Sequence, residues 1–179
     1  MGEGGERMEV VMSSDSILEQ EFCRLVEQYQ TALLRMCYIY LHDTALTEDA
    51  VQETFLKVYK SAAEFRRDCS EKTWLMRIAI NTCRDMQRTA WFRHVDRRVT
   101  LELLREPSIH AQEDDQDLTL AIMKLPNKLK EVVMLRYYQD MKISEIAAAL
   151  GLSPSSVSGR LGRAKVKLRT VLERGYFNG

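Results

Sequence analysis

Residues 143–169 read ISEIAAALGLSPSSVSGRLGRAKVKLR, and this stretch predicts two helices joined by a tight turn. Gly151 stands where the end of a helix needs a left-handed backbone. Ser153 and Pro154 are typical of a helix N-cap and of the first helical position. The small alanines before the turn would let the second helix cross closely. We therefore predict a helix–turn–helix whose first helix covers residues 143–150.

The second helix of this motif has an apolar face and an opposite face of small and basic residues. The residues that share one narrow sector, and are predicted to pack inward, are Val157, Leu161, Ala164, Leu168 and Val171. Gly159 and Gly162 fall on the opposite face, where each costs the helix about 1 kcal/mol relative to alanine. We expect this face to let the backbone approach DNA closely, and the alternative is a tolerated local weakness. The candidate DNA-contacting residues of the motif are Ser153, Ser155, Ser156, Ser158, Gly159, Arg160, Arg163 and Lys167.

Charge is distributed in blocks, although the formal net charge of the 179 residues is zero. Residues 1–60 carry 5 basic and 11 acidic side chains, and residues 61–105 carry 10 basic and 6 acidic ones. Residues 106–121 carry 5 acidic side chains and no basic one, and residues 122–179 carry 11 basic and 4 acidic ones. This alternation predicts two basic surfaces separated by an acidic segment.

Hydrophobic periodicity predicts an all-α chain made of two small helical bundles joined by a flexible acidic linker, with the helix–turn–helix in the second bundle. The expected divisions are a disordered N-terminal extension over residues 1–14, a first domain over 15–90, a linker over 91–117 and a second domain over 118–176. Serines at 14 and 16 are expected to cap the first helix. The third helix is expected to begin at Thr73.

The helix predicted over residues 48–63 carries two different stripes. Thr47 is its expected N-cap. Its core face consists of Val51, Phe55, Val58 and Ala62. A second, partly apolar stripe lies beside acidic residues and suits docking to the helices of another protein. The alternative is that Leu56 and Tyr59 cover another helix of the same bundle. The candidate docking residues are Asp49, Gln52, Glu53, Leu56, Tyr59 and Lys60.

The helix that follows Thr73 divides in the same way. Its inward face consists of Leu75, Ile78, Ala79, Thr82 and Met86. Its outward stripe consists of Trp74, Arg77, Asn81, Arg84 and Arg88. Guanidinium groups bind phosphates, an asparagine reads a base edge and an aromatic ring stacks on an unpaired base, so this stripe suits DNA that is opening. The alternatives are a core position for Trp74 and a merely solvated face for the arginines.

The sequence contains no pattern typical of a metal or cofactor site, and we expect neither. No CxxC spacing and no metal-ligand pattern connects Cys23, Cys37, Cys69, Cys83, His42, His94 and His110. We expect buried or incidental thiols in a reducing compartment. No apolar run approaches the roughly 20 residues of a membrane span, and the acidic start lacks a signal-peptide core. We therefore expect a cytoplasmic protein, with its start at Met1, Met8 or Met12.

Two quoted segments carry a family resemblance. Residues 125–169, LPNKLKEVVMLRYYQDMKISEIAAALGLSPSSVSGRLGRAKVKLR, resemble region four of bacterial RNA polymerase sigma factors. Residues 47–65, TEDAVQETFLKVYKSAAEF, followed by residues 73–88, TWLMRIAINTCRDMQR, resemble region two of the same family. Having these two regions alone, with a short linker between them, is similar to the extracytoplasmic-function (ECF) group. The resemblance runs from residue 18 to residue 174.

The resemblance implies an alternative sigma factor, not an enzyme, that binds core RNA polymerase and promoter DNA and directs transcription initiation, for example in a stress response. It implies that the docking stripe of residues 48–63 binds the clamp helices of the largest polymerase subunit. It also implies that the helix after Thr73, with the loop of residues 65–72, recognises and melts the downstream promoter element. This adds Arg66, Arg67 and Lys72 to the downstream DNA residues. The acidic linker would thread the polymerase cleft, and an anti-sigma factor, often membrane-bound, would hold the protein inactive.

The sequence also departs from the family pattern and admits other functions. Ser158, Gly159 and Gly162 stand where the family commonly has a basic residue, a serine and often a histidine, so the upstream sequence preference does not transfer. A first alternative is a helix–turn–helix regulator that acts without stable polymerase binding. A second is a helical nuclease, which would need clustered carboxylates, whereas the acidic residues cluster in the linker. A helical hairpin with a solvated basic face is the plainest alternative for residues 143–169.

Overall fold

The computed structural model describes the backbone of residues 14–92 and 113–177, and the side chains of residues 19–89 and 117–172. The predicted N-terminal extension and most of the predicted linker lie outside these residues. The described residues are helical and contain no strand, which confirms the predicted all-α class. Helices extend into both ends of the predicted linker, because α3 ends at Phe92 and α4 begins at Glu113. Acidic residues are favourable in the first turn of a helix, so an acid-rich stretch is compatible with a helix start.

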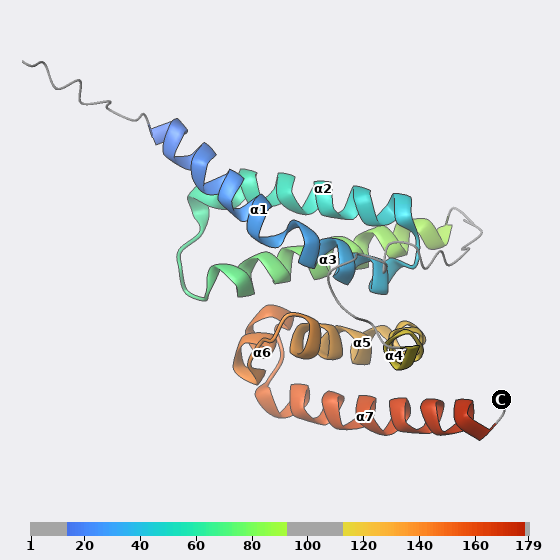
Figure 1. Cartoon of the computed structure of the whole chain (residues 1–179). Helices are drawn as coiled ribbons and strands as arrows, with labels where there is room; N and C mark the ends of the chain where they lie inside the picture. The colour runs from blue at the N-terminus through green and yellow to red at the C-terminus, as the bar shows by residue number, and fades with distance from the viewer. Residues whose placement is uncertain (1–13, 93–112, 178–179) are drawn as a thin grey trace, which may run out of the picture.

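The helices form two modules that lie one above the other in Figure 1. The first module consists of α1 (Ser14–Leu41), α2 (Thr44–Ser61), the short 3-10 helix η1 (Ala62–Glu64) and α3 (Glu71–Phe92). The second module consists of α4 (Glu113–Met123), α5 (Asn127–Val133), the π-helix η3 (Met134–Tyr138), α6 (Ile143–Leu150) and α7 (Pro154–Phe177). Within each module the helices pack on one another, and α3 also contacts α6 across the modules.

The predicted helix–turn–helix is confirmed, including the residues that cap its two helices at the turn. Helix α6 covers the predicted residues, and Gly151 ends it with a left-handed backbone at φ 66°. The Ser153 Oγ accepts a hydrogen bond from the Ser156 N–H at 3.2 Å, and Pro154 begins α7. Val157, Leu161 and Ala164 are buried as predicted, and Leu168 is half-buried. Val171 is 40% exposed, so the predicted inward face of α7 ends before it.

The prediction that Thr47 caps α2 is wrong. The helix begins at Thr44, and the Asp43 Oδ1 accepts a hydrogen bond from the Leu46 N–H at 2.8 Å. Thr47 is buried one turn into the helix, where its hydroxyl donates to the Asp43 carbonyl at 2.6 Å. A threonine followed by acidic residues resembles a helix start, but the aspartate three residues before Leu46 is the better N-cap. Helix α3 likewise starts earlier than predicted, because Ser70 caps it by accepting from the Thr73 N–H at 3.1 Å.

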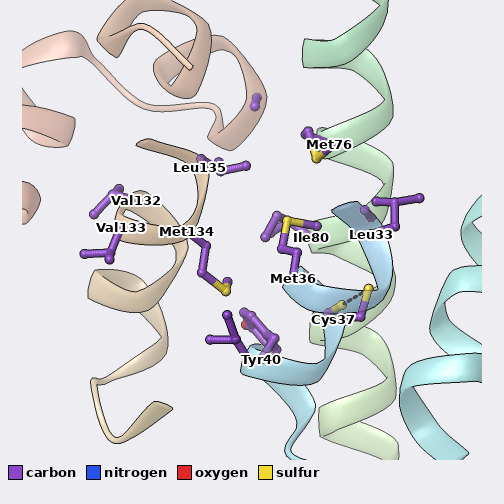
Figure 2. Packing of buried hydrophobic residues seen from close by; sticks show 14 of the residues in the cluster. Leu33, Met36, Cys37, Tyr40, Met76, Ile80, Val132, Val133, Met134 and Leu135 are labelled. Atoms are coloured by element: carbon purple, nitrogen blue, oxygen red, sulfur yellow. Dashed lines mark hydrogen bonds between the residues drawn. The ribbon is translucent and has the colours of Figure 1, made fainter. Parts of the chain in front are cut away.

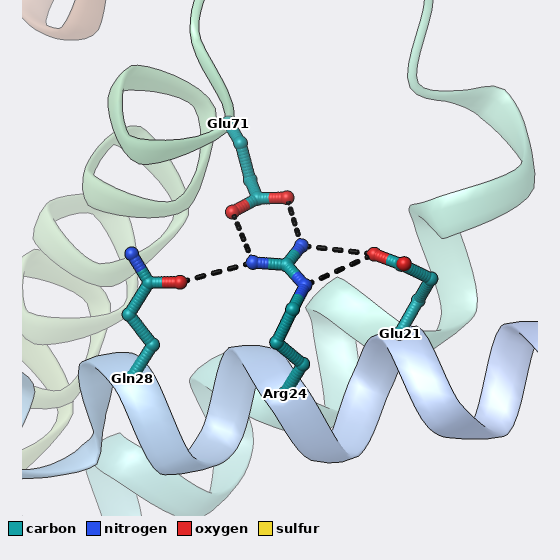
Figure 3. Close-up of polar contacts among 4 residues, drawn as sticks. All are labelled: Glu21, Arg24, Gln28 and Glu71. Carbon is teal, nitrogen blue, oxygen red and sulfur yellow. Dashed lines mark hydrogen bonds and ion pairs between the residues drawn. The ribbon is translucent and has the colours of Figure 1, made fainter.

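Arg24 ties α1 to the start of α3 (Figure 3). Its Nη2 lies 2.6 Å from the Glu71 Oε2 and its Nη1 lies 3.2 Å from the Glu71 Oε1, which makes a two-pronged ion pair. The same guanidinium donates to Glu21 and Gln28 of its own helix. The groups are partly exposed, so we expect a net stabilisation below about 1 kcal/mol and attribute to them the orientation of the two helices.

One hydrophobic core runs through both modules, which the sequence did not predict. Met36 and Tyr40 of α1 and Ile80 of α3 are buried together with Met134 and Leu135 of the second module. Figure 2 shows Met134 of the second module directed towards Met36 and Tyr40 of α1. The two modules are therefore packed against each other, with α3 and the end of α1 at the contact.

We expect Asp43→Ala to lower the free energy of unfolding by about 1 kcal/mol, because the variant leaves the first turn of α2 without its cap. Asp43→Asn keeps an N-cap side chain of similar quality and is the matched control. Urea unfolding followed by circular dichroism measures both. Equal losses in the two variants, or none in the alanine variant, would show that the cap does not stabilise α2.

Candidate DNA and protein interfaces

The predicted docking stripe of α2 is exposed. Leu56 is 45% exposed and Tyr59 is 55% exposed, and the two side chains lie one turn apart on the same side of the helix. The Tyr59 ring makes an edge contact with Phe22 of α1 at a centroid distance of 5.1 Å, so it covers part of its own bundle as well. The Glu53 carboxylate lies 3.5 Å from the Lys57 ammonium. Asp49, Gln52 and Lys60 are exposed and Glu53 is half-buried. The stripe is thus available to another protein in the described structure.

Trp74, at the start of the α3 stripe, is half-buried against the loop before the helix. Its ring stacks on Phe65 with a centroid distance of 4.5 Å and an interplanar angle of 19°. Part of the alternative interpretation therefore holds, because the indole packs inside its own module. Arg66 and Arg67 lie exposed beside this pair, and Arg67 has a left-handed backbone at φ 59°. The loop thus places the stacked rings of Phe65 and Trp74 next to two exposed guanidinium groups.

Three cationic side chains of the predicted downstream DNA set are bound to the second module. Arg84 donates from Nε and Nη2 to the two carboxylate oxygens of Glu131 at 2.8 and 2.7 Å. Arg77 donates from Nη2 to the Ala148 carbonyl at 2.8 Å. Lys72 donates to the Gln139 carbonyl. These contacts place the stripe of α3 against α5, α6 and the turn between them.

Asn81 and Arg88, the two other polar residues of that stripe, are exposed. The Asn81 Oδ1 accepts a hydrogen bond from the Arg84 Nη1 at 3.2 Å, and its side chain faces solvent. Arg88 is exposed and pairs with Asp85 at 3.1 Å. Arg77, Asn81 and Arg88 therefore lie outward as predicted, whereas the contacts of Arg77 and Arg84 with the second module were not predicted.

Sequence reasoning missed Glu131, the strongest partner of this stripe. Its side chain is 3% exposed and also accepts a hydrogen bond from the Tyr40 hydroxyl at 3.0 Å. The hydrogen bonds from Arg84 to Glu131 raise the pKa of Arg84, against the opposing effect of burial. Burial, followed by the negative charge of Glu131, raises the pKa of Tyr40. One feature of the sequence could have indicated it. Glu131 directly precedes the apolar Val132 and Val133, and a buried charge requires a partner.

The outer face of α7 presents the predicted upstream DNA residues to solvent. Ser153, Ser155, Ser156, Ser158, Gly159, Arg163 and Lys167 are exposed, and Arg160 is half-buried. A Cβ added at Gly162 would meet nothing within 4 Å, and one at Gly159 would meet only the Arg163 Nη1 at 4.0 Å. Both glycines therefore lie on an open surface, and no neighbouring side chain is close enough to require a glycine at either position.

The cysteines and histidines of the described residues build no metal site. No group of three or more histidine, cysteine or acidic side chains in this part of the chain is placed to hold a metal ion. Cys37 of α1 and Cys83 of α3 are buried with their sulfur atoms 3.4 Å apart. The hydrogen bond between the two thiols, followed by burial, raises the pKa of Cys37. Among the described helices, none has the length and apolar character needed to cross a bilayer.

Comparison with known proteins identifies the family of the chain. The family models for sigma-70 region 2 and sigma-70 region 4 match residues 25–93 and 115–168. RNA polymerase sigma factor CarQ of Myxococcus xanthus is 34% identical over 160 residues, which cover 86% of this chain and 88% of CarQ. The ECF RNA polymerase sigma factor SigW of Bacillus subtilis is 26% identical over 168 residues, covering 86% and 90%.

A solved structure supports the same family. CnrH, an RNA polymerase sigma factor of Cupriavidus metallidurans, has been solved in complex with the cytosolic domain of CnrY. It matches with a TM-score of 0.68 and 30% identity over 87% of this chain and 90% of that one. The resemblance seen in two short segments of the sequence thus extends to both modules. The chain belongs to the ECF group of RNA polymerase sigma factors.

Proposed function

We propose that this sigma factor binds core RNA polymerase through α2, contacts the upstream promoter element through α7, and opens the downstream element with α3. The observation that carries the proposal is the outer face of α7. Its serines, glycines and cations are solvent-exposed on the second helix of a correctly capped helix–turn–helix. A helix of this kind enters the major groove with its N-terminal residues near base edges, while basic side chains hold phosphates.

The docking stripe of α2 supports the polymerase contact. Leu56 and Tyr59 together expose an apolar surface in a helix that buries Val51, Phe55 and Val58. Asp49, Gln52 and Lys60 frame it with exposed polar groups, which favours a helical partner of defined charge. A regulator that acts without polymerase would have no use for this surface, so co-purification with core polymerase separates the two functions.

The loop of residues 65–72 and helix α3 support the opening of DNA. Phe65 and Trp74 already form a stacked pair, and stacking on aromatic rings tolerates any base. Asn81 and Arg88 are both exposed and lie two turns apart on the same face of α3, where the amide can reach a base edge and the guanidinium a phosphate. Unstacking a base costs a few kcal/mol, which such contacts must offset.

Partners and location follow from the same assignment. A protein that binds core polymerase and promoter DNA would act in the cytoplasm, as a DNA-binding regulator and not as an enzyme. An anti-sigma factor is the expected inhibitor, and the complex of the related CnrH with the cytosolic domain of CnrY supports a partner of this kind. The predicted passage of the acidic linker through the polymerase cleft concerns residues that lie mainly outside the described part of the chain.

We expect the double variant Glu53→Lys/Leu56→Ala to abolish binding to core polymerase without unfolding the first module. The partly exposed Glu53–Lys57 pair contributes at most about 1 kcal/mol to stability, and Leu56 is almost half exposed. Gel filtration with purified core enzyme measures binding, and circular dichroism measures folding. Glu27→Lys reverses an exposed charge on α1 and serves as the control. Undiminished binding of the double variant would remove α2 from the polymerase interface.

We expect Asn81→Ala to reduce promoter opening by polymerase containing this sigma factor, with Arg77→Ala reducing it further. The reason is the loss of a base contact in the first variant and of a phosphate contact in the second. Permanganate reactivity of exposed thymines in the promoter reports the opening. Gln30→Ala changes an exposed amide of α1 and is the control. Unchanged reactivity in both variants would show that α3 does not face the melted DNA.

We expect Gly159→Ala/Gly162→Ala to stabilise α7 and to weaken promoter binding. Both methyl groups fit in the free protein, and each removes a helix penalty of about 1 kcal/mol. On DNA, the same methyl groups would hold the backbone away from the groove. Thermal unfolding and promoter affinity of the reconstituted polymerase measure the two effects. Equal or tighter binding would leave the glycines as a tolerated weakness with no role at the DNA.

A further inference from the structure

Two buried thiols meet in the core of the first module. The Cys83 Sγ of α3 lies 3.4 Å from the Cys37 Sγ of α1, and both side chains are 0% exposed. The dashed line beside Cys37 in Figure 2 marks this contact. Ala79 stands one turn before Cys83 and is also fully buried, so small side chains line this part of α3. The fold thus brings two cysteines that are 46 positions apart in the sequence into direct contact.

The other two cysteines of the chain have different surroundings. Cys23 of α1 is exposed, and Cys69 lies half-buried in the loop before α3. A single exposed thiol reacts with whatever reaches it, whereas two thiols in contact can react with each other. Neither Cys37 nor Cys83 belongs to the proposed polymerase or DNA surfaces. A role for this pair is therefore independent of the proposed function.

The geometry of the pair suits a disulfide better than a metal ion. A closed zinc site takes four nitrogen or sulfur ligands. Among residues 19–89 and 117–172, no three histidine, cysteine or acidic side chains are grouped to hold a metal ion. A disulfide needs only the two sulfur atoms at about 2.05 Å, so they must approach by roughly 1.4 Å. Rotation of the two side chains and a small shift of the helices would supply this movement.

Burial keeps the pair reduced until an oxidant reaches it. The hydrogen bond between the thiols, followed by burial, raises the pKa of Cys37, and a protonated thiol is a poor nucleophile. A single buried thiol would be inert for this reason. Hydrogen peroxide is little larger than water, so a small local opening of the module admits it. A sulfenic acid formed on either sulfur would already touch the thiol that resolves it.

We propose that Cys37 and Cys83 form a redox couple, which a peroxide oxidises to an intramolecular disulfide. In the first step one thiolate attacks a peroxide oxygen, the O–O bond breaks, and a sulfenic acid and hydroxide form. In the second step the other thiol attacks the sulfenic sulfur, the S–O bond breaks and water leaves. The two thiols lose two hydrogen atoms in total, and hydrogen peroxide is reduced to two molecules of water. A dithiol reductant reverses the change by thiol–disulfide exchange.

The disulfide would crosslink α1 to α3 and enclose α2 between them. Its loop spans 46 positions, and a crosslink of this length lowers the conformational entropy of the unfolded chain. We expect the oxidised protein to unfold at a temperature about 5–10 °C above that of the reduced protein. In a reducing compartment the bond would form under oxidative conditions and be lost when they end.

The variant Cys23→Ser/Cys69→Ser isolates the pair in the full-length chain. After treatment with hydrogen peroxide, we expect alkylation in denaturant to label neither remaining thiol, and dithiothreitol to restore both labels. Mass spectrometry of the oxidised chain should show the loss of two hydrogen atoms, and its peptide map should link Cys37 to Cys83. Cys83→Ala in the same background is the matched control. It should show neither the mass loss nor the rise in unfolding temperature.

Each result decides for or against the redox couple. Full labelling of both thiols after peroxide treatment would overturn it, and so would irreversible oxidation or a link between separate chains. An equal rise in unfolding temperature in the alanine control would also overturn it. If the serine variant does not fold, the peptide map of oxidised wild-type protein decides by the presence or absence of the link between Cys37 and Cys83. Transcription with core polymerase tests the proposed function separately, because these measurements need neither polymerase nor DNA.

Discussion

The carboxylate of Glu131 sits inside the contact between two helical modules, and the arrangement of the whole chain depends on how its charge is satisfied. Burial of an unpaired carboxylate would cost several kcal/mol, more than most single apolar contacts return. Arg84 and Tyr40 meet this requirement from two different helices of the first module. The modules must therefore approach in one register, because a rotation of either would leave the charge without donors. Apolar packing favours the contact, and this polar cluster selects its geometry.

The backbone of the second module contributes to the same geometry through an irregularity. A π-helix follows α5 directly, and the Gln139 N–H reaches the Met134 carbonyl at 3.1 Å, five residues back. Such wide turns are rare and often occur at functional sites. Here the wide turn leads to Asp140, which has a left-handed backbone at φ 48°, and brings Gln139 against the first module. The local strain of this segment thus accompanies a contact between modules.

The sequence predicted features that depend on neighbours along the chain. The caps of α6 and α7, the buried positions of α7 and the exposed stripe of α2 each follow from residue type and a period of 3.6 residues. The prediction of the α2 cap was wrong because Asp43 and Thr47 both resemble a helix start. Only Asp43 lies where its side chain can accept from an unpaired N–H of the first turn. The contact between modules could not be predicted. The sequence shows that Met76, Ile80 and Tyr40 are large and largely apolar, but it does not show which surface covers them. The partner of Arg84 lies 47 residues away and leaves no periodic signal.

In α7 the residues that stabilise the helix and the two glycines lie on opposite faces. A helix with two internal glycines gains little from intrinsic propensity, and most helices in proteins depend on tertiary packing in any case. The packing of α7 is supplied by Val157, Leu161 and Ala164, which are buried on the face opposite both glycines. The module therefore tolerates the weakness where the helix faces solvent. The first module uses its surface differently, since Arg84, Arg77 and Lys72 of α3 donate to the second module and are also the groups proposed to contact DNA. The packing of the two modules and the proposed DNA contact would therefore use the same hydrogen-bond donors. The outer face of α7 supplies no donor to the first module in the contacts described above.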